Sequence, residues 1–317
     1  MKKHFTVCVF AAFAMLTHNI AYAAAPASCA ANSKVASGTI KREGKHFTVV
    51  VEGTGPDVVL IPGLASPREV WDPTVSALRN CYTLHTVQIR GFGDEAGINA
   101  DGPVLEPFVK ELADYIDDEI TDKGRAAPAI IGHSLGGLSA LMIAARYPQE
   151  TGKVMVVDAL PYIGTLFNPA ATVDMVKPQA EAMAAAMRST YGKPQPAMKD
   201  ADPGVQSQAG FYSNSVMGRT AVARWMRASD PRVVAQAFYD DMTTDIRQEL
   251  PKILARVTLL YAQDDSAFSV EKAKATFEPQ YAGTLSFTAH MITGSRHFIM
   301  LDQPEKFSSE VAAFLAE

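Results

Sequence analysis

The sequence predicts an α/β protein whose mostly parallel sheet is flanked by helices. Short runs of β-branched and apolar residues alternate with amphipathic helical windows along most of the chain, which is the order of elements in a parallel sheet with crossover helices. Of the 317 residues, 48% are hydrophobic and 20% are charged. This composition excludes a disordered chain, and the sequence has no collagen or solenoid repeat.

Seven segments are expected to be strands because they are short, apolar and rich in β-branched residues. The second of them, Asp57–Ile61 (DVVLI), is apolar after its first residue, as expected of a buried strand. The seven are Phe47–Glu52, Asp57–Ile61, Tyr82–Ile89, Ala129–Ile131, Lys153–Val157, Arg256–Tyr261 and Leu285–Ile292.

Three helices are expected between and after these strands. In Leu105–Ile120 the apolar residues recur every three or four positions, which is the spacing of one helix face. Leu135–Tyr147 is helical until Pro148, and Glu305–Leu315 begins after a proline.

The segment of about a hundred residues after Asp158 shows no clear strand pattern. It holds seven of the thirteen methionines and strong helix formers such as Gln179–Arg188. We interpret residues 159–254 as a helical insertion over the carboxyl edge of the sheet, with an adaptable apolar pocket. Methionines that only fill the core are the alternative. The seven are Met175, Met183, Met187, Met198, Met217, Met226 and Met242.

The N-terminus has the three parts of a secretory signal peptide. Lys2 and Lys3 precede the apolar run Phe5–Leu16, and the small-residue pattern Ala21–Ala23 follows. Residues 1–23 are therefore predicted to be removed on export to the periplasm or the medium, with an N-terminal core helix as the alternative. No other stretch approaches 18 apolar residues, so no stable membrane anchor is expected.

Charge and cysteine counts exclude several classes of protein. The 29 Lys and Arg residues against 34 Asp and Glu argue against a nucleic-acid binder. Three cysteines cannot form a disulfide scaffold or a four-thiolate zinc site. Cys8 would leave with the signal peptide, so Cys29 and Cys81 form either one disulfide or two inert thiols. No metal-ligand spacing or phosphate-binding loop is present, and no metal or cofactor is expected.

One motif in the sequence indicates a catalytic residue. In Ile131–Gly137 (IGHSLGG), Ser134 lies between a strand and a helix with glycines two residues before and after it, the pattern of a nucleophile elbow. Side chains at Gly132 and Gly136 would collide with the neighbouring strand and helix. The helix start also places N–H groups beside Ser134. A chance match in a loop would lack this strand–turn–helix context, so Ser134 is the predicted nucleophile.

With this motif, the chain resembles the α/β-hydrolase superfamily over nearly all of its predicted mature length. It is most similar to the secreted bacterial esterases, lipases and peptidase-like enzymes that carry a lid. The resemblance implies a hydrolase core, residues 24–158 and 255–317, with a helical lid, residues 159–254, inserted after the sixth strand. Its segments are Leu60–Trp71, Gln88–Gly93, Ile130–Gly137, the strand ending at Tyr261 with its acids, and Gly294–Pro304.

A serine hydroxyl needs a base near neutral pH, and His297 is the candidate. It lies in a loop directly after the last predicted strand, which matches the family's chain order of nucleophile, acid and histidine. A surface histidine is the alternative. Two other histidines lie in the signal segment, three at or within strands, and one beside the serine with its ring expected to point elsewhere: His4, His18, His46, His85, His290 and His133.

The sequence does not decide which aspartate provides the carboxylate that would orient His297. Asp264 and Asp265 both follow the strand ending at Tyr261. The pattern of similar secreted enzymes favours Asp264, whereas the general family spacing favours Asp265. Asp158, at the end of the preceding strand, is the remaining candidate because some family members place the acid there.

The resemblance also implies an oxyanion hole of two backbone N–H groups. Leu135 follows the nucleophile, and Leu64 lies in Pro62-Gly63-Leu64, which stands for the family's His-Gly-x. Pro62 departs from that pattern, so a side-chain contact that often orders this loop is absent.

The predicted function is hydrolysis of a small carboxylic ester with a hydrophobic acyl or aryl part. The alternative is amide, peptide or lactone hydrolysis on the same residues, for which Asp240, Asp241 or Asp245 could bind a substrate amine. A binding protein that keeps the triad without turnover is a third possibility, which the intact serine, histidine and acid disfavour.

Overall fold

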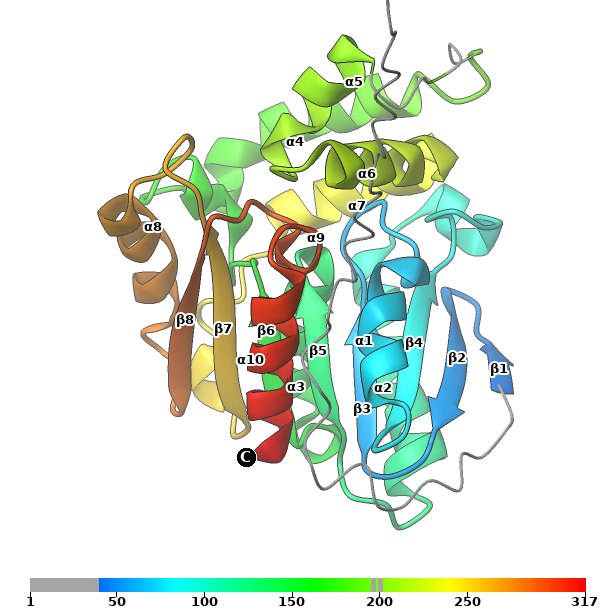
Figure 1. The fold of residues 1–317 in the computed structure, drawn as a ribbon. Coiled ribbons are helices and arrows are strands. Elements are labelled where there is room, and N and C mark those ends of the chain that lie inside the picture. The colour runs from blue at the N-terminus through cyan, green and yellow to red at the C-terminus, as the bar shows by residue number, and fades with distance from the viewer. Residues whose placement is uncertain (1–39, 195–197, 199–201) are drawn as a thin grey trace, which may run out of the picture.

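The computed structural model describes residues 40–194, 198 and 202–317, and these form one eight-stranded sheet with helices on both faces (Figure 1). The spatial order of strands is β1-β2-β4-β3-β5-β6-β7-β8. The predicted α/β class with a mostly parallel sheet is confirmed. The strands are β1 (Ile40–Glu43), β2 (Phe47–Gly53), β3 (Asp57–Ile61), β4 (Thr83–Ile89), β5 (Ala129–His133), β6 (Lys153–Val157), β7 (Arg256–Gln263) and β8 (Phe287–Thr293).

Only β2 runs against the other strands of the sheet. β1 pairs with β2, and β2 pairs with β4, in antiparallel register. Every pairing from β4 through β3, β5, β6 and β7 to β8 is parallel. The carboxyl ends of six strands therefore meet at one edge of the sheet, which is where ligands bind in open α/β sheets.

The helices α1 and α10 cover one face of the sheet, and α2, α3 and α8 cover the other (Figure 1). Within β3, Val58 and Leu60 pack on the first side, whereas Val59 and Ile61 pack on the second. The helices are α1 (Asp72–Leu78), α2 (Leu105–Ile116), α3 (Leu135–Arg146), α4 (Val173–Arg188), α5 (Pro203–Gln208), α6 (Val216–Ala228), α7 (Pro231–Thr243), α8 (Val270–Phe277), α9 (Ile299–Asp302) and α10 (Pro304–Ala316).

Short helical turns connect these elements. One of them, η4, is a π-helix that continues α2, so the single helix expected to reach Ile120 changes its hydrogen bonding after Ile116 while Ile120 stays buried. The turns are η2 (Arg68–Trp71), η3 (Gly97–Asp101), η4 (Asp117–Thr121), η5 (Pro148–Glu150), η6 (Ile163–Leu166), η7 (Ala209–Phe211), η8 (Leu250–Lys252) and η9 (Glu278–Tyr281).

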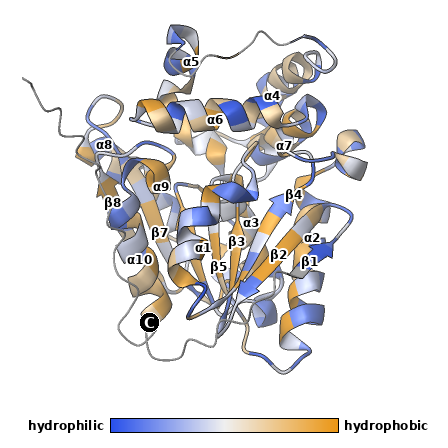
Figure 2. Ribbon diagram, turned by 45° about the vertical axis from the view of Figure 1, so that its right-hand side comes forward, coloured by the Kyte–Doolittle hydropathy of each residue, from blue (hydrophilic) through white to orange (hydrophobic). Residues whose placement is uncertain are grey.

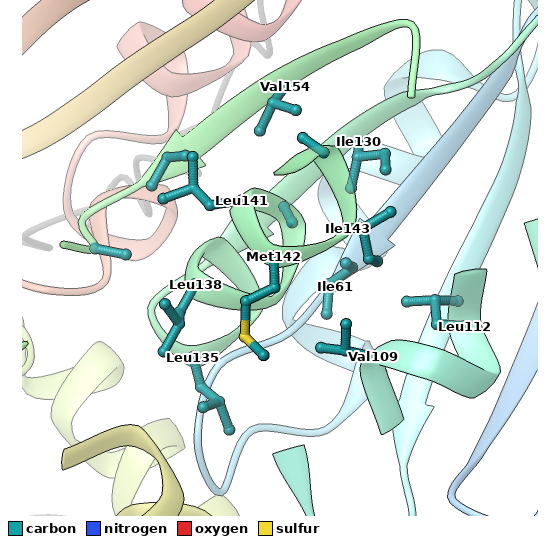
Figure 3. Packing of buried hydrophobic residues seen from close by; sticks show 14 of the residues in the cluster. Ile61, Val109, Leu112, Ile130, Leu135, Leu138, Leu141, Met142, Ile143 and Val154 are labelled. Carbon is teal, nitrogen blue, oxygen red and sulfur yellow. The ribbon is translucent and has the colours of Figure 1, made fainter. Parts of the chain in front are cut away.

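The central helix α3 is buried almost around its whole circumference. Its residues from Leu135 to Ala145 are all buried, and Figure 3 shows Met142 beside Ile61 and Val109, with Leu138 on the other side of Met142. A helix with no exposed face is held from all sides, because any displacement would open gaps in the close-packed core. The first turn of α3, which carries the serine motif, is therefore fixed in place.

Helices α4, α5, α6 and α7 lie above the carboxyl edge of the sheet (Figure 1). They come between β6 and β7 in the chain, and α4 packs against α7. Figure 2 shows both hydrophobic and hydrophilic residues along α4 and α6. As predicted, the described part of residues 159–254 contains no strand. The boundaries of this insertion as a separate unit remain a prediction.

Some elements were not expected from the sequence. Strand β1 (IKRE) has only four residues and three of them are charged, so the alternating pattern of a longer strand is missing. Helices α1 and α8 have seven and eight residues, too few for a clear helical period. Both lie at places where the chain crosses from one strand to the next.

The predicted signal peptide, residues 1–23, lies outside the described residues. Cys81 is disulfide-bonded, and its predicted partner, Cys29, also lies outside them. No helix in the described part of the chain has both the length and the apolarity to cross a membrane.

Candidate active site

Ser134 lies on a strained turn between β5 and α3. Its backbone angles are φ 54° and ψ −123°, which a residue with a side chain rarely adopts. The Ser134 N–H donates to the carbonyl of Val157 at 2.9 Å, and its own carbonyl accepts from Gly137 at 2.7 Å. The turn is therefore tied both to the neighbouring strand β6 and to the first turn of the helix.

The two flanking glycines leave no room for a side chain, as the sequence predicted. A Cβ atom on Gly132 would lie 2.1 Å from the carbonyl oxygen of Gly136. A Cβ atom on Gly136 would lie 2.3 Å from the carbonyl oxygen of Ile61 in β3. Both obstacles are backbone atoms that cannot rotate away. The serine turn thus requires glycine at both positions.

His297 is paired with Asp158. The ring Nδ1–H donates to Asp158 Oδ2 at 2.7 Å, and the side chains are 17% and 9% exposed. Asp158 directly follows β6, where its φ of 48° turns the chain away from the sheet. Its other oxygen, Oδ1, accepts the Ala262 N–H at 2.8 Å. This arrangement holds the imidazole in the tautomer whose Nε2 is free to accept a proton.

The expectation that Asp264 or Asp265 would contact His297 is wrong. Asp264 accepts hydrogen bonds from Ser266 and, at 3.0 Å, from the amide of Asn214. These bonds, chiefly that from the Ser266 hydroxyl, lower the pKa of the Asp264 carboxyl. Asp265 accepts from Gln263 Nε2 at 2.8 Å.

The physical reason for this correction is the length of β7. The strand continues two residues past Tyr261, so both acids lie beyond its end, where Asp264 accepts from Ser266 and Asn214 and Asp265 accepts from Gln263. Asp158, which directly follows the adjacent strand β6, faces the histidine instead. It was the third candidate in the sequence.

His133 supports the histidine loop from below, a role that sequence reasoning missed. It is fully buried, its Nε2–H donates to the backbone carbonyl of His297 at 3.0 Å, and the two ring centroids are 4.7 Å apart. Burial lowers the pKa of His133 well below its usual value, so the ring stays neutral. The residue before the serine thus fixes the backbone of His297 while Asp158 fixes its ring.

The two predicted backbone donors lie near this turn. Leu64 lines the same cavity as Ser134, and Leu135 is the first residue of α3. Neither N–H donates a hydrogen bond to another group of the described chain. A first-turn N–H group of a helix has no partner within the helix and carries part of the positive end of its dipole.

Ser134, Asp158 and His297 line one cavity of about 460 Å³. Its other walls are largely apolar and come mainly from the insertion. Four of the seven methionines in the predicted insertion line it, and two of these four, Met183 and Met226, are also exposed to solvent. Apolar lining residues are Leu160, Ile163, Leu166, Phe167, Met183, Met187, Phe211, Val222, Met226, Val234, Phe238 and Met242.

Of the three acids considered as amine anchors, the structure places one in the cavity. Asp240 accepts the backbone N–H groups of Val104 and Leu105. Asp245 is paired with Arg247. Asp241 lines the cavity. Within the described residues, no cluster of three or more His, Cys, Asp or Glu side chains could hold a metal ion.

A strained serine between strand and helix and a histidine–aspartate pair on the same edge of a parallel sheet define an α/β-hydrolase type of enzyme. The chain belongs to the alpha/beta hydrolase family, since the family's sequence model matches residues 58–310.

Several known proteins are similar to this chain. The pimeloyl-[acyl-carrier protein] methyl ester esterase of Vibrio atlanticus is 23% identical over 83% of this chain and 96% of its own length. An esterase from Thermogutta terrifontis matches with a TM-score of 0.68 and 17% identity over 88% of this chain and 98% of that one. The enol-lactonase of Burkholderia xenovorans matches with a TM-score of 0.63 and 16% identity over 86% and 97%.

Replacement of Gly132 by alanine tests the crowding at the serine turn. The new methyl group would meet the Gly136 carbonyl, and we expect the free energy of unfolding to fall by about 3 kcal/mol or more. Gly210→Ala is the matched control, because the nearest atom to its Cβ is 3.7 Å away, and it should change stability by about 1 kcal/mol or less. Urea titrations of both variants make the comparison; equal midpoints would contradict the expectation.

Proposed function

We propose that the protein is a serine hydrolase, acting without a cofactor, that cleaves carboxylic esters with a hydrophobic acyl or aryl part. The observation that carries the proposal is that Ser134 and the His297–Asp158 pair line one apolar cavity. A nucleophile, a base and the group that orients the base are the parts that acyl transfer needs.

In the proposed mechanism, Ser134 Oγ attacks the ester carbonyl and His297 Nε2 accepts its proton. The protonated ring then gives this proton to the leaving alcohol, and an acyl-enzyme forms on Ser134. Water repeats the sequence in the second half of the reaction and releases the acid. Asp158 keeps Nδ1 protonated and stabilises the imidazolium, because its carboxylate accepts the Nδ1–H.

The negative oxygen of the tetrahedral intermediate would lie between the N–H groups of Leu64 and Leu135. Their lack of other partners in the described chain supports this role. Both groups belong to backbone that packs tightly. A Cβ on Gly63, before Leu64, would lie 2.9 Å from His133 Nδ1, and a Cβ on Gly136, after Leu135, would lie 2.3 Å from the carbonyl oxygen of Ile61. Donors that are already in place need no reorganisation when the charge develops.

The helical insertion would act as a lid that binds the apolar part of the substrate. Its support is the lining of the cavity by residues of α4, α6 and α7. A volume near 460 Å³ lies within the range of small-molecule sites, roughly 300–1,000 Å³. Some of the similar proteins are esterases, which supports the proposal that the bond cleaved is a carboxylic ester.

Replacement of Ser134 by alanine tests the nucleophile. Without the hydroxyl no acyl-enzyme can form, so kcat on p-nitrophenyl esters should fall by about 10⁶-fold. Labelling by a fluorophosphonate probe, read on a gel, should vanish in Ser134→Ala and persist in Ser139→Ala, whose hydroxyl donates to a backbone carbonyl within α3. Persistent labelling of Ser134→Ala would place the nucleophile elsewhere.

Asparagine substitutions separate the candidate acids. Asp158→Asn should lower kcat by about 10³–10⁴-fold, because an amide NH₂ favours the wrong tautomer of His297. Asp264→Asn and Asp265→Asn should keep kcat near the wild-type value, since neither carboxylate bonds the histidine. Steady-state kinetics of the three variants decide the assignment. A large loss in Asp264→Asn with a small one in Asp158→Asn would reverse it.

Amide, peptide or lactone hydrolysis on the same groups is the second candidate. The observation that favours it is the acid Asp241 on the cavity wall, where it could bind a substrate amine. A panel of esters of graded length beside arylamides and lactones, compared by kcat/KM, separates the two.

We also propose that the protein is exported to the periplasm or the medium. The signal-like residues 1–23 support this, and so does the disulfide-bonded Cys81, because disulfides persist in oxidising compartments. In a bacterial host, protein purified from the periplasm should begin near Ala24 in N-terminal sequencing. Recovery from the cytoplasm of a chain that still begins at Met1 would contradict export.

A further inference from the structure

A buried carboxyl group faces the cavity without a partner. Asp241, on α7, is 8% exposed and lines the cavity. Within the part of the chain that the structure describes, no group donates a hydrogen bond to its side chain and no cation pairs with it. Its carboxylate oxygens keep access to the cavity, so a partner for this group would come from what the cavity binds and not from the surrounding described chain.

The neighbouring acids show that Asp241 is not part of a general acidic surface. Asp240 accepts the Val104 and Leu105 N–H groups at 2.8 and 3.0 Å, at the start of α2. Asp245 forms two bonds with Arg247, at 2.9 and 2.6 Å. Each of these acids therefore has a structural contact, and Asp241 has none among the described residues.

The position of Asp241 on its helix is one where an apolar residue would be expected. Val234, Phe238 and Met242 line the cavity from the same face of α7. Burial raises the pKa of the Asp241 carboxyl to about 7, an effect that the charge of His297 opposes and that of Asp240 increases. An apolar residue would avoid this desolvation, so the carboxyl group opposes stability unless a ligand pairs with it.

The charges around the cavity favour a cation. Three aspartates line it, Asp158, Asp241 and Asp264, against one arginine, Arg296. That arginine donates to Ser266 and lies 3.7 Å from Asp264, so it is already engaged. A positively charged group that enters the cavity therefore finds Asp241 as its unpaired counter-ion.

We propose that Asp241 is a specificity-determining residue that binds an ammonium group of the substrate. The preferred substrates would then be esters whose otherwise apolar acyl part carries a primary amine. This inference rests on the proposed ester hydrolysis for the substrate bond, and on Asp241 alone for the amine. The ammonium N–H groups would donate to the carboxylate, and a charge-assisted bond of this kind is stronger away from water.

Methyl esters of six- to eight-carbon acids that end in an ammonium, a hydroxyl or a methyl group test the proposal. The wild-type enzyme should hydrolyse the amino esters with a kcat/KM at least about tenfold higher than the methyl-terminated ones. Asp241→Asn should abolish this preference, because it should lower kcat/KM for the amino esters at least about tenfold more than for the methyl-terminated esters. Asp240→Asn, one residue away, should keep it.

Binding measurements decide the question independently of turnover. Calorimetric titration with n-hexylammonium and n-hexanol should show tighter binding of the ammonium to the wild-type protein, and loss of that difference in Asp241→Asn. If no ester is hydrolysed and the ammonium preference persists in binding, the proposed ester hydrolysis fails and the amine site stands.

Three results would overturn the amine site. They are equal binding of ammonium and alcohol by the wild-type protein, a preference for the hydroxyl esters, and an equal loss on all three ester types in Asp241→Asn. The last would mean that Asp241 supports the fold. Circular dichroism of Asp241→Asn confirms that the variant is folded before either comparison.

Discussion

The close approach of three backbone segments at the Ser134 turn is the constraint on which the rest of the site depends. At this turn the end of β5, the start of α3 and the end of β3 lie within contact distance of one another. A Cβ at Gly132 would therefore collide with the Gly136 carbonyl, and a Cβ at Gly136 with the carbonyls of Ile61 and Pro62. The strain in the backbone of Ser134 persists because the buried helix α3 and the hydrogen bond to Val157 leave the turn no alternative. A serine on such a turn projects from the sheet edge toward the cavity.

His297 comes from a loop more than 150 residues away in the chain, and it is held at separate points. Asp158 binds its ring, His133 binds its carbonyl, and the next residue, Phe298, donates its N–H to the carbonyl of Tyr212 at 2.9 Å. His133 is the last residue of β5 and Asp158 directly follows the neighbouring strand β6, whereas Tyr212 belongs to the insertion. The histidine is thus positioned jointly by the sheet and by the helices above it, which matters because proton transfer depends on geometry within a few tenths of an ångström.

The wall that the insertion contributes to the cavity is apolar except for one acidic side chain, Asp241 on α7. Helices α4, α6 and α7 supply methionine, valine and phenylalanine side chains, and the methionines among them can adapt to hydrocarbon of varied shape. Asp241 interrupts this wall at a position where burial makes a carboxylate unfavourable. Local destabilisation of this kind is typical of functional sites, where one unfavourable group is retained because a ligand pairs with it. In the function that we propose, the size and apolarity of the cavity set the range of substrates, and the Asp241 carboxyl group narrows that range.

The sequence by itself determined the α/β class, most strand positions, the serine turn and His297, because each depends on a local pattern: a hydrophobic period, two glycines, or a place in chain order. Only the tertiary structure decided that Asp158 and not Asp264 contacts His297, and that Asp241 and not Asp240 faces the cavity. These choices rest on where a strand ends relative to its neighbours and on which face a helix turns inward. Adjacent aspartates are equivalent in sequence, but in space one residue along a helix is a rotation of about 100°, which separates a cavity wall from a backbone contact.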